Sequence, residues 1–444
     1  MRIGKVFVVG SGIAGLSLAA AMSPHAGEVI VVERDAEPEG PRRRPGVPHA
    51  ALTHTLMEGG LRAFSELFGD FLGDLAEDGV VPLSMSADLA WWTYHGWAHR
   101  LDNAHRLLSC SRPLLEWRIR RIVAALPNVE FRYHTRVTGL LARGDARVHG
   151  VRTADGGELT GADLVVDATG RHARGVTWLK ELGIGEPEST VVDIGSGHTS
   201  VRFHGPLALA DPWRGIVLQS APHTSRRGQV LPIENGEWLL TVVGCLGDRP
   251  PADFEGVREF SAGLADPVLG RVLEAVDPIE VAGFRPTGNR RFEFDALPVW
   301  PDGFVVVGDA ACHFNPVYAQ GMTVAAQTAL SLRDMILRAG LGPGSGRALQ
   351  ARVTSAGEVA WLTATGVDQG LLAGDAHRPD LRGRYLQRVM NLGRVDAGAQ
   401  AAALDLLTLC GSPSALFGPR VLRALPRRIP AIPRPRILKD DGDD

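Results

Sequence analysis

Residues 3–33 read IGKVFVVGSGIAGLSLAAAMSPHAGEVIVVE and contain the pattern that decides the fold. Residues 6–9 are a continuous apolar run rich in valine, which is typical of a parallel strand buried on both faces. A glycine-rich turn follows at once, residues 16–22 have the composition of a short apolar helix, and residues 28–33 form a second strand-like run. The stretch therefore predicts a strand, a turn, a helix and a second strand, which is the β-α-β unit that binds nucleotides.

The turn has glycine at positions 10, 12 and 15, and each has a physical role in such a unit. Gly10 permits a tight turn, Gly12 lets backbone amides approach a pyrophosphate, and Gly15 lets the helix pack closely on the strand. Glu33 ends the second strand. A carboxylate at this place accepts hydrogen bonds from an adenosine ribose and favours a free 2′-hydroxyl, as in FAD or NAD.

Length and composition place the chain among ordinary globular proteins. It has 444 residues, of which 45% are hydrophobic and 22% charged, and its formal net charge is -3. These values indicate two or three domains and give no reason to expect a nucleic-acid partner. The four cysteines form no C-x-x-C pair, and no histidine, aspartate or glutamate set has metal-ligand spacing, so we expect a reduced, cytoplasmic protein without a metal. No apolar run reaches the ~18 residues of a membrane span.

Further strand patterns indicate a second domain inserted into the first. Residues 164–170 and 304–308 repeat the buried strand that ends in glycine, whereas residues 190–286 alternate in the antiparallel manner. The sequence predicts an α/β fold with a discontinuous Rossmann-type domain, an inserted domain with a mixed or antiparallel sheet, and a helical C-terminal region. The expected boundaries are 1–85, 101–186 and 287–340 for the Rossmann-type domain, 86–100 and 187–286 for the inserted substrate-binding domain, 341–425 for the C-terminal helices, and 426–444 for a Pro/Arg-rich tail that we expect to be disordered.

A second motif, far along the chain, distinguishes FAD from NAD. Residues 306–322 read VVGDAACHFNPVYAQGM, a buried strand followed by a loop that enters a helix. Asp309 can accept hydrogen bonds from sugar-alcohol hydroxyls. The amides of residues 319–322 lie at a helix N-terminus, where the helix dipole favours a developing negative charge. A reduced flavin needs such a partner.

Together these motifs resemble a known family. The chain is similar to the single-component FAD-dependent monooxygenases of the p-hydroxybenzoate hydroxylase superfamily. Within it the similarity is to bacterial epoxidases and hydroxylases of natural-product pathways, such as polyether-type olefin epoxidases. The segments that carry the resemblance are residues 10–15, Glu33-Arg34, 44–48, 111–116, 167–171, 231–234, 249–251 and 308–322.

The resemblance implies a tightly bound FAD and a set of residues that hold it. Residues 12–15 would hold the pyrophosphate, Arg112 would reach the pyrophosphate or ribityl region, and the backbone of Val137 would face the adenine. Asp309 would bind the ribityl chain, and the amides of residues 321–322 would support the flavin ring. The complete set is Gly10, Gly12, Ile13, Ala14, Gly15, Glu33, Arg34, Arg112, Val137, Asp167, Gly170, Asp309, Gln320, Gly321 and Met322.

The resemblance also implies the reaction and shows where this chain departs from the pattern. In this superfamily NADPH or NADH reduces the FAD, O2 adds to it, and the resulting flavin C4a-hydroperoxide transfers one oxygen atom. The chain has no second strand-linked glycine motif, so we expect the nicotinamide nucleotide to bind transiently at the flavin face. After residues 46–48 the related enzymes continue Gln-Gly-Arg-His-x-His, but residues 49–54 read HAALTH and lack that arginine. Ala319 replaces a usual glycine.

The substrate is expected to be a small apolar organic molecule, namely an olefin, terpenoid or polyketide intermediate. Epoxidation of an alkene needs no protein base, and the chain has only four tyrosines from which to build a phenol-activating network. Candidate pocket residues are Trp92, Tyr94 and Trp97. No catalytic side chain is certain, and the candidates beside the flavin are Pro316, Tyr318 and His313.

Other functions remain open at this point. An aromatic hydroxylase and a flavin-dependent isoprenoid reductase would share the fold, and a non-enzymatic carrier would bind no FAD. A flavin halogenase needs W-x-W-x-I-P and a lysine near the flavin, and the sequence has neither. We expect a monomer or dimer, with at most a weak peripheral membrane association through the Arg-rich tail.

Overall fold

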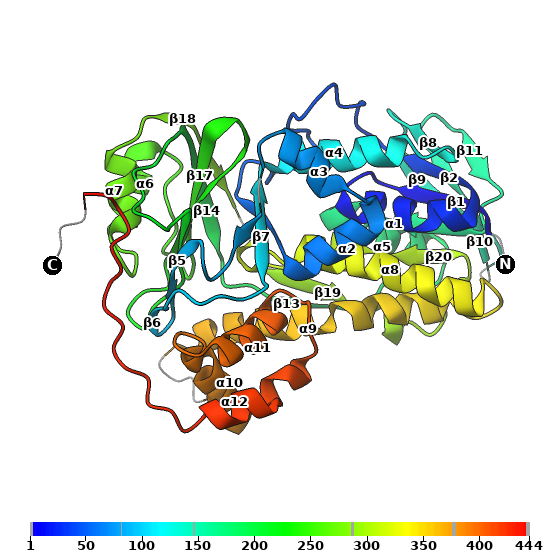
Figure 1. Ribbon diagram of the computed structural model, residues 1–444. Helices are drawn as coiled ribbons and strands as arrows, with labels where there is room; N and C mark the ends of the chain where they lie inside the picture. Colours follow the sequence, from blue (N-terminus) through cyan, green and yellow to red (C-terminus); the bar gives the residue numbers. More distant parts are fainter. Residues whose placement is uncertain (1–2, 81, 145–146, 286–287, 375–378, 441–444) are drawn as a thin grey trace.

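The computed structural model describes residues 3–80, 82–144, 147–285, 288–374 and 379–440. Its first domain is built on a five-stranded parallel sheet in the order β20-β12-β1-β2-β8. The strands are β1 (Ile3–Val9), β2 (Ala26–Val32), β8 (Val129–Arg132), β12 (Leu164–Asp167) and β20 (Phe304–Val306). Three parts of the sequence that lie far apart along the chain thus form one sheet (Figure 1), as the repeated strand pattern predicts.

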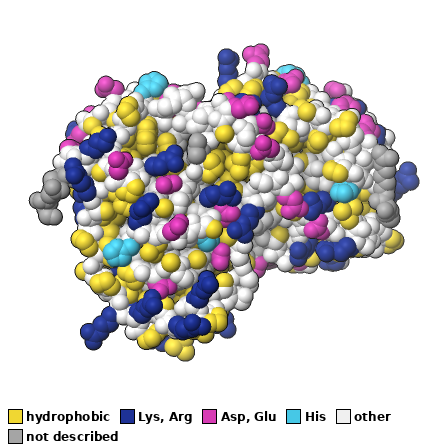
Figure 2. Space-filling view, viewed as in Figure 1, with side chains coloured by type: hydrophobic (Ala, Val, Ile, Leu, Met, Phe, Trp, Pro, Cys, Tyr) yellow, Lys and Arg dark blue, Asp and Glu magenta, His cyan; other side chains and the backbone are white. Residues whose placement is uncertain are grey.

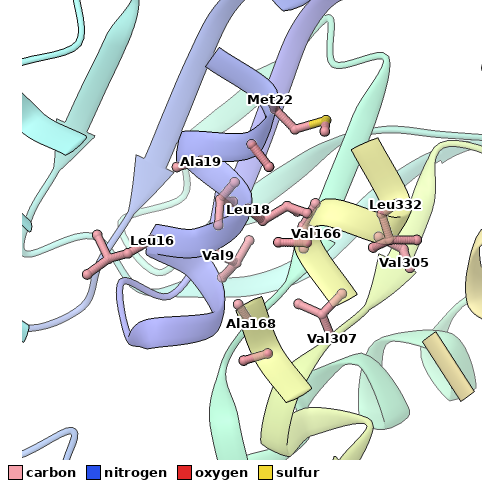
Figure 3. Packing of buried hydrophobic residues seen from close by; sticks show 14 of the residues in the cluster. Val9, Leu16, Leu18, Ala19, Met22, Val166, Ala168, Val305, Val307 and Leu332 are labelled. Carbon is pink, nitrogen blue, oxygen red and sulfur yellow. The ribbon is translucent and has the colours of Figure 1, made fainter. Parts of the chain in front are cut away.

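Helix α1 (Ile13–Met22) lies at the centre of this domain. Nine of its ten residues are buried, which is the pattern of a helix covered on all sides. It packs on the sheet and against the helices α2 (Glu58–Phe68), α4 (Arg112–Ala124) and α8 (Gly321–Ala339). Figure 3 shows Leu18 of α1 beside Val166 of β12, and Leu332 of α8 beside Val305 of β20. This core fixes the glycine turn that precedes α1 against the ends of the strands.

The inserted domain has a seven-stranded mixed sheet in the order β18-β14-β17-β16-β15-β5-β6. All neighbouring strands are antiparallel except the pair of β15 and β5. The strands are β5 (Leu89–Thr93), β6 (Gly96–Trp97), β14 (Gly197–His204), β15 (Gly215–Leu218), β16 (Arg227–Pro232), β17 (Glu237–Gly244) and β18 (Pro278–Phe284). Helices α6 (Phe254–Ser261) and α7 (Val268–Glu274) cover one face and share its core. The fold class expected from the sequence is confirmed.

Three smaller sheets complete the described part of the chain. One contains β3 (His54–Met57), β4 (Leu83–Ser84) and β7 (Arg106–Cys110); the second contains β9 (Val137–Arg143), β10 (Arg147–Thr153) and β11 (Glu158–Thr160); the third contains β13 (Ser189–Val192), β19 (Asn289–Phe292) and β21 (Cys312–His313). Helices α3 (Phe71–Glu77) and α5 (Arg174–Glu181) lie on the first domain. The third sheet is formed where the chain crosses between the two domains (Figure 1).

The C-terminal helices form a third layer. Helix α9 (Ser345–Ala373) runs beneath the first domain toward the second, and α10 (Leu381–Leu392), α11 (Ala397–Leu407) and α12 (Pro419–Ala424) make the lobe at the bottom of Figure 1. Basic side chains gather on this lobe in Figure 2, and they are arginines, because residues 341–425 contain no lysine. Exposed arginines of α10 and α12 at positions 382, 384, 420 and 423 belong to it. In the described residues no helix combines the length and the apolar character needed to cross a bilayer.

The expectation of a disordered tail over residues 426–444 is wrong for the part that the structure describes. Ile437 and Leu438 are buried, at 0% and 6% exposure, in the core of the inserted domain. The backbone N–H of Ala210 donates to the carbonyl of Ile437 at 2.7 Å, and Arg434 pairs with Asp266 at 2.9 Å. The prediction rested on the segment's proline and arginine content and gave no weight to the two apolar residues that complete the core. Residues 441–444 lie outside the described residues.

Candidate functional site

A cavity of about 630 Å³ runs between the two domains. It begins at the carboxyl ends of β1, β2, β12 and β20 and ends at β14 and β17 of the inserted domain. Open α/β sheets bind ligands at the carboxyl ends of their strands, and the volume lies within the roughly 300–1,000 Å³ typical of cofactor and ligand sites. The cavity is therefore the candidate active site.

The glycine turn forms one wall, and its three glycines differ in what a side chain would meet. A Cβ on Gly15 would lie 2.0 Å from the carbonyl oxygen of Gly10, so this glycine is required for packing of α1. Gly10 has a φ of +103°, which disfavours other residues. A Cβ on Gly12 would meet only Arg44 Nη2, at 3.9 Å, because Gly12 faces the cavity. A Cβ at Gly12 would project into the cavity. Because glycine has none, a pyrophosphate can approach the backbone of the turn closely.

Glu33 provides an acceptor in the same wall. Its carboxylate accepts the backbone N–H groups of Ser11 at 2.9 Å and Asp35 at 3.0 Å, together with the Ser11 hydroxyl. Burial opposes ionisation, but Arg44 and these hydrogen bonds hold the pKa of Glu33 below its usual value. An ionised carboxylate at the end of β2 fits the ribose hydroxyls of an adenosine.

A buried group of arginines lies next to Gly12. Arg44 contacts Asp35 at 3.1 Å and also pairs with Glu116, while Arg112 and Arg120 reach the Glu116 carboxylate at 3.0 and 3.1 Å. Although burial acts in the opposite direction, these three guanidinium groups lower the pKa of Glu116 to about 2. Arg44 and Arg112 line the cavity, so guanidinium donors of this group face a ligand there. This donor set fits the two phosphates of a dinucleotide.

The opposite wall carries the downstream motif. Asp309 lines the cavity with its carboxylate 3.7 Å from Arg171 Nε. The first turn of α8 begins at Gly321, and its N–H groups have no partner within the helix. Ala319, at the position where related enzymes have glycine, adopts the left-handed conformation with a φ of +52°. A residue with a Cβ in this conformation has a strain cost of about 1–2 kcal/mol relative to glycine. The residues of this wall fit the ribityl chain and ring of an FAD.

Beyond this wall the cavity has a lining without ionic side chains, which we call the non-ionic chamber. It is lined by Pro48, His49, Leu52, Thr53, His54, Thr55, His198, Thr241, Phe314, Asn315 and Pro316. Thr241 Oγ1 hydrogen-bonds the hydroxyls of Thr53 at 2.6 Å and Ser200 at 2.5 Å, and it accepts the Thr53 backbone N–H at 3.2 Å. The polar groups that this chamber offers to a ligand are hydroxyls, imidazoles and an amide.

The three histidines of the chamber are neutral at neutral pH. Burial lowers the pKa of His49 to about 2, of His54 to about 3 and of His198 to about 4. Nearby arginines, Arg112 for His54 and Arg227 for His198, act in the same direction. These imidazoles can exchange hydrogen bonds with a ligand but are weak bases.

Most of the sequence-predicted cofactor residues meet at the cavity. Gly15 and Asp167 do not line it. Asp167 is fully buried and accepts the N–H groups of Thr169 at 2.8 Å and Gly175 at 2.5 Å, which shapes the turn after β12. The predicted residues that line the cavity are Gly10, Gly12, Ile13, Ala14, Glu33, Arg34, Arg112, Val137, Gly170, Asp309, Gln320, Gly321, Met322 and Pro316.

The aromatic pocket candidates are not at the cavity. Trp97 is 3% exposed in the core of the inserted domain, with its ring edge-to-face to that of Trp92 at 5.3 Å. Tyr94 is 45% exposed at the turn between β5 and β6. These strands form the sheet edge away from the glycine turn (Figure 1). Two of the three catalytic candidates, His313 and Tyr318, also lie behind the cavity wall.

Sequence reasoning missed the chamber itself. Thr241 is a polar residue within the apolar run of β17, and His198 is one of several polar residues of β14; their register in the sheet brings them to the cavity. Arg44 and Arg171 stand within segments that carried the resemblance, but no motif rule marked them. A polar residue on the inward face of an otherwise apolar strand is the one signal that could have found Thr241.

Comparisons with known proteins agree with this geometry. A family model described as FAD binding domain matches residues 4–366. Protein Rv3254 of Mycobacterium tuberculosis is 34% identical over 342 residues, covering 73% of this chain and 71% of that protein. Squalene epoxidase 3 of Arabidopsis thaliana is 25% identical over 344 residues, covering 74% and 59%. The crystal structure of pqsL, a probable FAD-dependent monooxygenase from Pseudomonas aeruginosa, superposes with a TM-score of 0.63 at 17% identity, covering 84% of this chain and 97% of that chain.

Proposed function

The chain belongs to the FAD binding domain family of flavoprotein oxidoreductases, and from this premise we propose that it is a monooxygenase. It would use NADPH or NADH and O2 to oxidise an uncharged organic substrate. The observation that carries the proposal is the continuity of one cavity from the nucleotide-binding wall to the non-ionic chamber. A bound FAD supplies the electron-transfer and oxygen chemistry, which side chains alone do not provide.

The chain's own residues bind and orient the reactants. The turn at Gly12 and the arginines at 44 and 112 would hold the pyrophosphate, and Glu33 the adenosine ribose. Asp309 would hold the ribityl chain. The N-terminus of α8 would place partial positive charge beside the flavin ring, where reduction adds negative charge. The non-ionic chamber would receive the substrate and exclude bulk water. Exclusion of water limits decomposition of the oxidant before it reacts with the substrate.

Epoxidation or hydroxylation of an apolar natural product remains our first proposal for the reaction. It is supported by the similarity to squalene epoxidase and by the lack of ionic groups among the chamber's lining residues. A cationic substrate would lose hydration there and would be repelled by Arg112 and Arg171, which line the same cavity and act on His49. Neutral histidines with lowered pKa values are also compatible with a reaction that needs no protein base.

Aromatic hydroxylation is the second proposal, and a different observation favours it. The hydroxyls of Thr53 and Thr241 form a chain that can present either a donor or an acceptor to a ligand. A purely apolar substrate would leave this capacity unused, whereas a phenol would use it. The chamber thus accepts a polar group as well as an apolar one.

Substrate-dependent oxidation under labelled oxygen tests these proposals. NADPH and NADH oxidation should be measured with the FAD-loaded protein, with and without squalene as an alkene probe or 2-naphthol as a phenol probe, under ¹⁸O2. One ¹⁸O atom in an epoxide supports the first proposal, and one in an aromatic hydroxyl supports the second. An unlabelled, saturated product would identify an isoprenoid reductase. A rate of nucleotide oxidation that ignores both probes and O2 would contradict monooxygenase activity.

A further inference from the structure

Asp368 is a fully buried carboxylate on α9 that lies behind the cavity wall. Its Oδ2 accepts the side-chain amide of Asn289 at 2.7 Å and that of Asn315 at 3.4 Å. Its Oδ1 accepts the hydroxyl of Tyr318. Both asparagines are themselves 0% exposed. One side chain from the C-terminal helices thus connects β19 with the loop that precedes α8.

This loop carries the cavity-lining residues of the downstream motif. The backbone N–H of Asn315 donates to Asn289 Oδ1 at 2.9 Å, and the Asn315 side-chain oxygen accepts the N–H of Val317 at 3.3 Å. Asn315 and Pro316 line the non-ionic chamber, and residues 319–322 line the wall beside Asp309. Tyr318 points the other way, toward Asp368. The loop is therefore held from behind while its front surface forms the site.

The environment of Asp368 makes these contacts difficult to replace. Burial raises its pKa, and the hydrogen bonds from Tyr318, Asn315 and Asn289 oppose that shift. Arg227 lies over the Tyr318 ring at 5.7 Å and is the charged neighbour of the group. Removal of the carboxyl would leave two buried amides without their acceptor, which is unfavourable because water cannot replace it there.

We propose that Asp368 is a positioning residue that sets the 315–320 loop, and with it the N-terminus of α8, in the geometry that the bound FAD requires. The inference rests on the proposed function of the cavity as an FAD site. It assigns the C-terminal helical region a part in cofactor control, because Asp368 of α9 holds the loop through three hydrogen-bond partners, in addition to the longer contact between Thr363 of α9 and Gln320 at 3.5 Å.

The test compares D368A with E358A, a control on the same helix. Glu358 pairs with Arg291 of β19 at 2.8 Å, so E358A also removes a link between α9 and β19 but leaves the loop untouched. We expect D368A to weaken FAD binding at least tenfold and E358A to leave it within twofold. The two-electron reduction potential of bound FAD should fall by about 30 mV in D368A, which is a tenfold selective loss for the reduced form. A merely structural role would not move the potential.

Two further variants keep the proposal falsifiable if D368A does not fold. Y318F removes one partner and should shift the potential in the same direction by a smaller amount. D368N should restore wild-type behaviour, because its amide oxygen can accept the two asparagine donors while its NH2 donates to Tyr318. An unchanged potential in both D368A and Y318F, or a D368N protein as impaired as D368A, would overturn the proposal. Failure of wild-type protein to bind FAD would instead overturn the proposed function.

Discussion

Gly12 and Gly15 are both glycines of the turn, but a substitution at Gly12 should affect FAD binding and one at Gly15 should affect stability. Gly12 has an ordinary backbone conformation, with φ and ψ of -73° and -177°, and an added Cβ would enter the cavity. We therefore expect G12A to keep the thermal stability of the wild type and to lose FAD affinity by at least tenfold. Thermal unfolding monitored by circular dichroism and titration with FAD measure the two quantities.

G15A is the matched contrast. Its Cβ would collide with the Gly10 carbonyl, so overpacking should reduce the free energy of unfolding by about 1–3 kcal/mol even without cofactor. A G12A protein that binds FAD like the wild type would show that this glycine does not face the pyrophosphate. A G15A protein of unchanged stability would contradict the packing of α1.

His198 should make the apoprotein sensitive to acid. Its folded pKa of about 4 lies below the ordinary value of 6.5, so between these pH values the unfolded chain binds a proton that the folded chain does not. Stability then falls as the pH is lowered through this window, with a slope of up to about 1.4 kcal/mol per pH unit from this group. H198N should reduce the slope measured by urea unfolding between pH 6.5 and 4.

His204, an exposed histidine on the same strand, provides the control variant H204N. Equal slopes in H198N and wild type would mean that His198 is not held neutral. Other chamber histidines add their own contributions, so the comparison is between slopes and not between absolute stabilities.

At this scale the sequence predicted the residues that belong to a motif. The glycines, Glu33 and Asp309 stand next to strands whose apolar runs show where the chain turns. His198, Thr241 and Asp368 belong to no recognisable motif. Their roles arise from sheet register or from contacts between residues 50 or more positions apart in the sequence. Trp92 and Trp97 gave a false signal, since a large aromatic side chain fits a core as well as a pocket.

At the scale of elements, the Pro/Arg-rich tail has a structural role that its composition does not indicate. Ile437 is fully buried against the inserted domain, so I437A should lower the free energy of unfolding by about 2–5 kcal/mol. Urea unfolding measures this change.

Leu422, which is 47% exposed on α12, is the control, and L422A should stay within about 0.5 kcal/mol of wild type. If I437A were as stable as L422A, the tail would not be part of the core. The tail was missed because prolines and arginines usually mark solvent-exposed chain, while only two residues decide that it packs.

At the scale of the whole molecule, the repeated strand pattern predicted the discontinuous domain and the inserted sheet. Parallel strands buried on both faces are apolar throughout, so the pattern was visible without knowing their order. The cavity between the domains could not be predicted in the same way, because it depends on how the two sheets face each other. Its lining therefore corrects the expectation of an aromatic substrate pocket.

Titration of the purified apoprotein with FAD tests most directly whether this cavity is an FAD site. We predict saturable binding of one FAD per chain, with visible absorption bands shifted from those of free FAD because the ring leaves water for the protein cavity. An FAD spectrum that stays unchanged, without saturation, would contradict the claim.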